Sequence, residues 1–189
     1  MPAVCRSCRL HAAMAASFAL LYAVPAAAQP TGLAPSVYLQ ANWTHDDTQA
    51  LTLGATLPWR DWHAQLWGGE LRGYWDMYLS RWSFDGLAER ESTVLLGITP
   101  TLRLWTNPGK SPWFWEAGIG ATLASKRYQT PRREFSTRFN FASHLGLGLQ
   151  LGAQGRHELQ LRLQHISNAG IKKPNPGENF LQLRYAVRY

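Results

Sequence analysis

The chain has 189 residues, of which 46% are hydrophobic and 12% aromatic, and its formal net charge at pH 7 is +7. Beyond the N-terminal region, no run approaches the roughly 18 consecutive apolar residues of a transmembrane helix, and no segment keeps a helical period. These features exclude a helical membrane protein and a helical bundle.

The first 28 residues have the pattern of a secretory signal peptide. Arg6 and Arg9 precede an uncharged apolar run over residues 12–24, and a stretch of small residues ends at Ala28. Cleavage after Ala28 would leave residues 29–189, which are enough for one domain.

Removal of this signal would leave a mature chain without cysteine, because Cys5 and Cys8 both lie within it. The mature chain could then use neither disulfides nor thiolate metal ligands. The signal holds two of the 19 basic residues and none of the 12 acidic ones, so the mature domain keeps its basic excess. That excess suits an acidic partner, but it does not choose between nucleic acid and anionic lipid.

Apolar and polar residues alternate with a period of two along most of the remaining chain, as in β-strands with one apolar face. We predict a β-bulge at Gly68-Gly69 and an irregularity at Pro100, since proline cannot donate a ladder hydrogen bond. The eight predicted strands cover residues 37–43, 51–57, 62–75, 94–104, 113–123, 139–151, 159–167 and 181–189.

The polar faces of these strands carry charged side chains, including Arg103, Glu116, Arg138 and Arg162. Such faces fit the crowded interior of a small closed barrel whose apolar faces meet lipid, since closure removes every unpaired strand edge. Eight strands enclose a space that side chains can fill, so we expect no pore. The predicted fold is an all-β, eight-stranded antiparallel transmembrane β-barrel.

The connections between the predicted strands alternate in length, as in outer-membrane barrels, which have short periplasmic turns and longer outer loops. The exception is the first outer loop, residues 44–47, which is brief. The predicted short turns are residues 58–61, 106–112 and 152–157, and the predicted long loops are residues 76–91, 124–137 and 168–178.

The seventh predicted strand ends in residues that can carry chemistry. Its outward-facing leucines continue, without a change of parity, into His165 and Ser167. Acyl transfer requires a nucleophile, a base, a group that orients the base, and donors for the developing oxyanion. The residues available for these four roles are Ser167, His165, Glu178 and Asn168, with the backbone amides of Ala169 and Gly170 as further donors.

Two geometric points leave the catalytic interpretation open. Side chains at i and i+2 of a straight strand stand about 7 Å apart, so a bond between His165 and Ser167 needs local twist or a bulge. Counted back from the last strand, Glu178 points inward, and only the loop could turn it toward His165. The alternative is that His165 and Ser167 merely end the strand at the interface, where polar residues are common.

The string His165-Ile166-Ser167-Asn168-Ala169-Gly170, followed by Asn175, Gly177 and Glu178, resembles the outer-membrane lipid A 3-O-deacylases of the PagL type. The resemblance implies an eight-stranded barrel that hydrolyses the ester at position 3 of lipid A without a metal or other cofactor. It implies that Ser167 is the nucleophile, His165 the base, Glu178 the orienting acid and Asn168 an oxyanion contributor.

Clustered cations in the outer loops are candidates for contact with the phosphates of a surface glycolipid, with solvated loop charge as the alternative. His45 with Asp46 and Asp47 could ligate a cation, although a solvated turn explains them better. The candidate cations are Lys126, Arg127, Arg132, Arg133, Lys172 and Lys173.

We therefore expect a serine esterase of the bacterial outer membrane, with its active site near the extracellular surface, that releases a 3-hydroxy fatty acid from lipid A. Its partners would be lipopolysaccharide and membrane lipid. Nucleic acid is not expected, and a homodimer is compatible with the sequence. The alternatives are a structural or adhesin-like small barrel without catalysis, and an acyltransferase that passes the acyl group to a second lipid.

Overall fold

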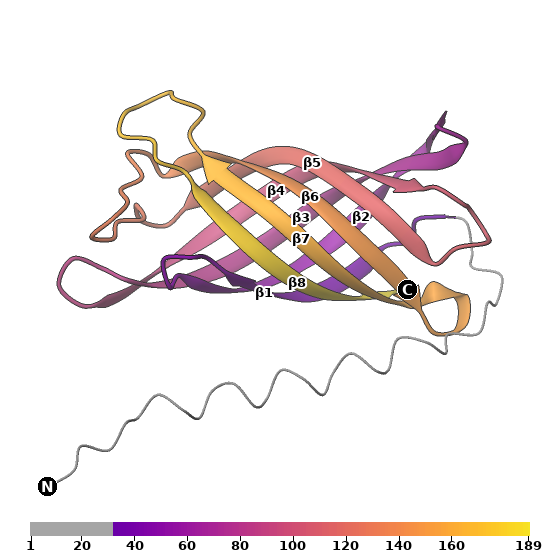
Figure 1. Ribbon diagram of the computed structural model, residues 1–189, viewed down its shortest axis with the longest axis horizontal. Coiled ribbons are helices and arrows are strands. Elements are labelled where there is room, and N and C mark those ends of the chain that lie inside the picture. Colours follow the sequence, from indigo (N-terminus) through magenta and orange to yellow (C-terminus); the bar gives the residue numbers. More distant parts are fainter. Residues whose placement is uncertain (1–31) are drawn as a thin grey trace, which may run out of the picture.

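The computed structural model describes residues 32–189, which form a closed antiparallel barrel of eight strands (Figure 1). Each strand pairs with its neighbours in the chain, and β1 closes the barrel against β8. The predicted fold class is confirmed; the predicted signal peptide lies outside the described residues. The strands are β1 (Ser36–Trp43), β2 (Gln49–Leu66), β3 (Gly69–Asp85), β4 (Arg90–Trp105), β5 (Trp113–Ala124), β6 (Phe139–Leu151), β7 (His157–Ser167) and β8 (Glu178–Arg188).

The two ends of the barrel differ in their connections. The long-loop end carries residues 44–48, 86–89, 125–138 and 168–177, whereas the short-turn end carries residues 67–68, 106–112 and 152–156. The last of these turns contains the short 3₁₀ helix η1 (Ala153–Gly155). Within residues 32–189 there is no helix with the length and apolar character needed to cross a membrane.

The predicted boundary between the second and third strands is wrong. The hairpin turn lies at Trp67-Gly68, where both residues have positive φ, 52° and 77°, as a two-residue type I′ turn requires. The predicted turn at residues 58–61 lies instead inside β2, which pairs with β3 on both sides of an irregularity between Pro58 and His63. There the Trp59 indole covers Gly73 so closely that a Cβ would not fit.

The predicted long loop over residues 76–91 is also wrong, because β3 and β4 continue as a hairpin and leave only residues 86–89 as loop. Pro100 causes no shift of register between these strands, since Trp75 pairs with it in an unbroken ladder. On the other side of β4, the pairing with β5 omits residues 99 and 100 and resumes at Thr101 in the same register.

The barrel wall is apolar outside and polar inside, the reverse of a soluble protein. Leucines such as Leu53 and Leu163 are more than 60% exposed on the outer wall. Arginines, carboxylates and glutamines are buried inside it. Arg138 corrects one expectation: it precedes β6, is exposed, and donates to the carbonyl of Ala124.

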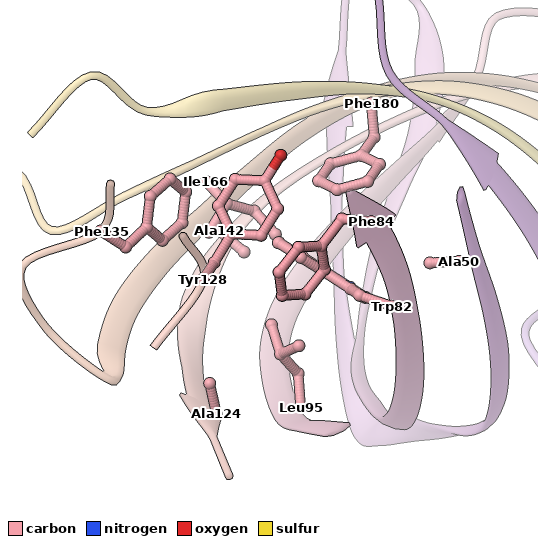
Figure 2. Packing of buried hydrophobic residues seen from close by; sticks show 10 residues of the cluster. All are labelled: Ala50, Trp82, Phe84, Leu95, Ala124, Tyr128, Phe135, Ala142, Ile166 and Phe180. Atoms are coloured by element: carbon pink, nitrogen blue, oxygen red, sulfur yellow. The ribbon is translucent and has the colours of Figure 1, made fainter. Parts of the chain in front are cut away.

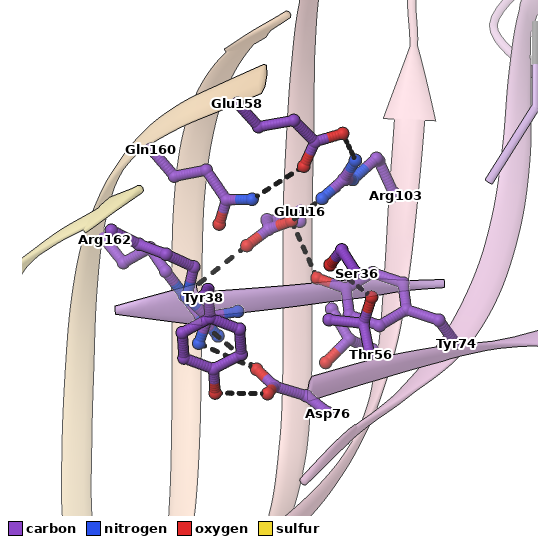
Figure 3. A network of polar contacts seen from close by, with 12 residues as sticks. Ser36, Tyr38, Thr56, Tyr74, Asp76, Arg103, Glu116, Glu158, Gln160 and Arg162 are labelled. Atoms are coloured by element: carbon purple, nitrogen blue, oxygen red, sulfur yellow. Dashed lines mark hydrogen bonds and ion pairs between the residues drawn. The ribbon is translucent and has the colours of Figure 1, made fainter. Parts of the chain in front are cut away.

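A network of paired charges fills the middle of the interior (Figure 3). Arg103 bonds to Glu158 at 2.7 Å and to Glu116 at 3.1 Å. Asp76 binds Arg162 at 3.2 Å, and Arg162 also contacts Glu116 at 3.4 Å. Asp76 on β3 and Arg162 on β7 lie on opposite sides of the barrel, so their pairing connects those two sides. Removing either partner would leave a buried charge unpaired.

An aromatic cluster closes the interior at the long-loop end (Figure 2). Trp82 packs against Phe180 with ring centroids 4.6 Å apart, and Tyr128 packs against Phe84 at 4.8 Å and Phe135 at 5.1 Å. This cluster also includes Ile166, the inward-facing residue between His165 and Ser167. The candidate site on the outer wall therefore has a rigid support directly behind it.

Candidate active site

His165 and Asn179 stand opposite each other on β7 and β8, and both side chains face outward. Nδ1 of His165 lies 2.8 Å from Oδ1 of Asn179. Because an amide oxygen can only accept, the ring carries its proton on Nδ1 and leaves a lone pair on Nε2. An imidazole held in this tautomer is ready to take a proton through Nε2.

Gly177 lies against the imidazole of His165. A Cβ on Gly177 would fall 2.6 Å from Cε1 and 3.1 Å from Nε2 of His165. Only a glycine leaves space for this Cε1–Nε2 edge of the ring.

Ser167 ends β7 on the same outward side as His165. Its Oγ accepts a hydrogen bond from the N–H of Ala169 at 3.4 Å, and within residues 32–189 it has no hydrogen bond to His165. Ala169 itself is left-handed, with φ of 53°. A nucleophile and a donor for an oxyanion need this kind of proximity.

Glu178 does not join His165, contrary to the predicted Ser-His-Glu arrangement. It is 2% exposed and faces the interior, as strand parity predicted, because it pairs with the inward-facing Ile166. Its Oε2 accepts a hydrogen bond from Tyr128 at 3.0 Å and lies 3.5 Å from Nε of Arg133. The loop does not rotate the carboxylate outward, and the amide of Asn179 takes the position beside the imidazole.

Asn168 organises the loop after β7 rather than facing Ser167. Its side chain is buried, donates to Ser136 Oγ at 2.9 Å and to the carbonyl of Lys172 at 2.8 Å, and accepts from the N–H of Gly170 at 2.9 Å. Of the predicted oxyanion donors, the Asn168 amide and the Gly170 N–H are thus already bonded, and the Ala169 N–H is the one near Ser167.

Four of the six predicted phosphate-contacting cations are paired with acids inside the protein. Lys126 pairs with Glu91 and Arg127 with Glu134, both at the surface. The other pairs join Asp46 to Arg132 at 3.0 Å and to Arg133 at 2.6 Å. Hydrogen bonds from Arg133 and Arg132 hold the pKa of Asp46 below its usual value.

Lys172 and Lys173 are the two remaining cations of the predicted set. Both are exposed in the loop that follows Ser167, and within residues 32–189 neither has an ion-pair partner.

Two other groups of residues form no site. Ser143 faces outward and His144 inward, where its ring lies against Gly118, so they form no dyad. Asp46, which follows His45 in the sequence, forms ion pairs with two arginines. The described residues contain no group of three or more side chains that could hold a metal.

A groove of about 1280 Å³ runs over the outer wall and reaches His165 and Asn179. It crosses the strands along a paired row in which Ile119 lies beside Ser143 and Ser143 beside His165. Trp59 and Trp62 line its far end, and Trp43, Thr44 and His45 line the end nearest the site. Its shape and apolar lining suit an extended hydrocarbon chain.

Asn179 is the residue that the sequence analysis missed. The signal was present, because Asn179 shares parity with Leu181 and Leu183 in the last strand and so had to face outward with His165. Glu178 was predicted instead, because the usual partner of a catalytic histidine is a carboxylate.

A closed barrel with an apolar outer wall, and a serine and histidine on that wall, define an outer-membrane β-barrel enzyme. The family model for lipid A 3-O-deacylase (PagL) matches residues 49–188. Lipid A deacylase PagL of Bordetella bronchiseptica is 33% identical over 171 residues, which cover 87% of this chain and 88% of that protein. The chain belongs to the PagL family of lipid A 3-O-deacylases.

Two further comparisons agree. Lipid A deacylase PagL of Pseudomonas aeruginosa is 31% identical over 140 residues, covering 72% of this chain and 78% of the relative. The crystal structure of the outer membrane enzyme PagL superimposes with a TM-score of 0.68 at 26% identity, covering 82% of this chain and 99% of that one.

Proposed function

We propose that this protein hydrolyses the ester at position 3 of lipid A, with Ser167 as nucleophile, His165 as base and Asn179 as the residue that orients the base. The observation that carries the mechanism is the 2.8 Å contact between His165 Nδ1 and Asn179 Oδ1. It fixes the tautomer in which Nε2 can accept a proton, and Gly177 leaves the space that the Cε1–Nε2 edge of the ring occupies.

In the first half of the reaction, Oγ of Ser167 attacks the ester carbonyl carbon while Nε2 of His165 takes the hydroxyl proton. The carbonyl oxygen becomes an oxyanion, and the N–H of Ala169, which leaves its 3.4 Å bond to Ser167 Oγ as that oxygen attacks, donates to it. The bond between the carbonyl carbon and the sugar oxygen then breaks, and His165 returns its proton to that oxygen. The products are the deacylated sugar and an acyl-serine.

In the second half, water attacks the acyl-serine and gives its proton to His165. Breakdown of this intermediate releases the 3-hydroxy fatty acid and returns the proton to Ser167 Oγ. Asn179 remains neutral throughout and bonds to Nδ1–H in both the neutral and the charged imidazole. An amide stabilises the imidazolium less than a carboxylate would, because it brings no negative charge.

Substrate binding follows from the groove and from the placement of the site on the outer wall. The acyl chain lies along the apolar groove, which extends from His165 toward Trp59 and Trp62. The long-loop end faces the cell exterior, so the ester meets Ser167 at the level of the outer leaflet. Lys172 and Lys173, both exposed, lie where they can contact the phosphates of the sugar.

The test is mass spectrometry of lipid A from cells that express the parent protein or Ser167→Ala. The parent should remove one hydroxyacyl group, and the variant should remove none while keeping the heat-modifiable gel mobility of a folded barrel. Recovery of the acyl group as free acid identifies hydrolysis, whereas recovery on a second lipid identifies acyl transfer. Deacylation by a folded Ser167→Ala protein at the parent rate contradicts the proposed nucleophile.

A further inference from the structure

Arg133 joins three chain segments at the long-loop end. It lies in the loop between β5 and β6, and its Nε contacts Asp46, in the loop between β1 and β2, at 2.6 Å. Its Nη1 donates to the carbonyl of Gly177 at 2.9 Å, and its Nε lies 3.5 Å from Glu178. The guanidinium thus connects the β1–β2 loop to the start of β8.

The carboxylate of Glu178 links Arg133 to Asn179. Oε1 of Glu178 accepts a hydrogen bond from the N–H of Asn179 at 3.0 Å. Oε2 accepts from Tyr128 at 3.0 Å, and the Tyr128 hydroxyl also bonds to Thr48 at 2.7 Å. Glu178 is therefore fixed from two sides, and its position sets the position of the Asn179 backbone.

Residues 177–179 are also the segment that surrounds the imidazole. Gly177 lies against the ring of His165, and Asn179 binds its Nδ1. A shift of this segment would move both contacts together. Arg133 contacts Gly177 and Glu178 directly, yet it is absent from the groove lining.

We propose that Arg133 is a positioning residue for ester hydrolysis, and that its bonds to Asp46, Gly177 and Glu178 hold the start of β8 where Asn179 orients His165. The Arg133–Glu178 pair thereby acts on the base through Asn179 from inside the wall. The proposal rests on the proposed function. It differs from the phosphate-binding role that the sequence suggested for Arg133, because the positioning role affects the chemical step rather than lipid binding.

The test compares Arg133→Ala with Arg132→Ala. Arg132 is the matched control, since it shares Asp46 but is 73% exposed and has no bond to Gly177 or Glu178. Arg133→Ala should lower kcat by about 10- to 100-fold with little change in KM, because small displacements of a catalytic group cost this much. Arg132→Ala should change kcat by less than about 2-fold, as expected for an exposed pair. Arg133→Lys should recover part of the loss.

A double-mutant cycle with Asn179→Ala isolates the route of the effect. If Arg133 acts through Asn179, then Arg133→Ala in the Asn179→Ala background should cost less than about 3-fold, well below its effect in the parent protein. Full additivity of the two losses contradicts the proposal. A rise in KM for both Arg132→Ala and Arg133→Ala, with kcat unchanged, assigns the arginines to phosphate binding instead.

Two further measurements separate the possible failures. If Arg133→Ala does not fold into a heat-modifiable barrel, Asp46→Asn and Arg133→Lys decide the question, because each weakens the same connection and should lower kcat without raising KM. An active Ser167→Ala protein overturns the proposed function itself. An inactive Ser167→Ala protein together with full kcat in every folded Arg133 and Asp46 variant overturns only the positioning role.

Discussion

Glu178 and Asn179 are adjacent in β8, yet their side chains lie on opposite sides of the barrel wall. The carboxylate bonds to Tyr128 inside, and the amide bonds to His165 outside. Strand geometry requires this separation, because successive side chains of a strand alternate between its faces. The acid and the partner of the histidine are therefore two different residues, one on each side of the wall.

The first prediction concerns these two residues. Asn179→Ala should lower kcat by about 10- to 100-fold, since it removes the acceptor that fixes the imidazole. Asn179→Asp should keep or raise kcat, because a carboxylate accepts the same bond and stabilises the imidazolium. Glu178→Gln should cost less than Asn179→Ala, because glutamine can still accept from Tyr128. A larger loss in Glu178→Gln than in Asn179→Ala would restore the carboxylate as the direct partner.

The second prediction concerns Gly177, with Gly170 as its matched control. Both have positive φ, 66° and 81°, so alanine should cost each about 1 kcal/mol of folding stability. Only a Cβ on Gly177 would meet the His165 ring, whereas nothing lies within 4 Å of one on Gly170. Gly177→Ala should therefore lose most of its activity and Gly170→Ala should retain it. Equal kcat in the two variants, measured on lipid A in detergent, contradicts the assigned ring contact.

The third prediction concerns acid pH. The pKa of Asp46 is lowered by its hydrogen bonds to Arg133 and Arg132 from a reference value of 3.8. A lowered pKa in the folded state means that Asp46 stabilises the protein above pH 3.8, and that this contribution disappears as the pH falls from there toward the folded pKa. Asp46→Asn should therefore destabilise the barrel at pH 6, and less at pH 2 than at pH 6.

Urea unfolding of both proteins at pH 6 and pH 2, followed by tryptophan fluorescence, measures this difference. If the free energy of unfolding differed between the parent protein and Asp46→Asn by the same amount at both pH values, Asp46 would not be the source of this pH dependence.

The fourth prediction concerns Lys172 and Lys173. Each exposed lysine near a membrane surface contributes about 1 kcal/mol to attraction of an anionic lipid, so each alanine substitution should raise KM by roughly 5-fold. The effect should shrink on dephosphorylated lipid A and at high salt, where charge attraction is screened. An equal effect on both substrates would place these lysines away from the phosphates.

The strands were predictable where outward residues are aliphatic and inward ones are polar or glycine, as in β5 to β8. The pattern failed at the ends of β3. At the long-loop end, Trp82 and Phe84 are buried inside the barrel. Apolar side chains therefore stand at inward-facing positions as well as outward-facing ones, and the apolar–polar alternation that predicts a strand is absent there. At the other end, the hairpin turn contains Trp67, a bulky residue that the sequence signals for such turns do not include.

The positions of His165 and Ser167 on the outer wall followed from parity alone, and so did the inward direction of Glu178. The sequence could not show how the side chains of Asn168, Arg133 and Asp46 would be used. Their bonds join loops that are far apart in the chain, and loop conformation depends on contacts that no strand period encodes.

The position of Ser167 on the outer wall also determines how substrate can arrive. Ser167 faces away from the barrel interior, so in the proposed mechanism the ester reaches it by lateral diffusion of lipid against the outer wall. The effective substrate concentration is then the mole fraction of lipid A in the surrounding leaflet, not its amount per unit volume. Dilution of lipid A with inert lipid at constant bulk concentration should slow the reaction in proportion.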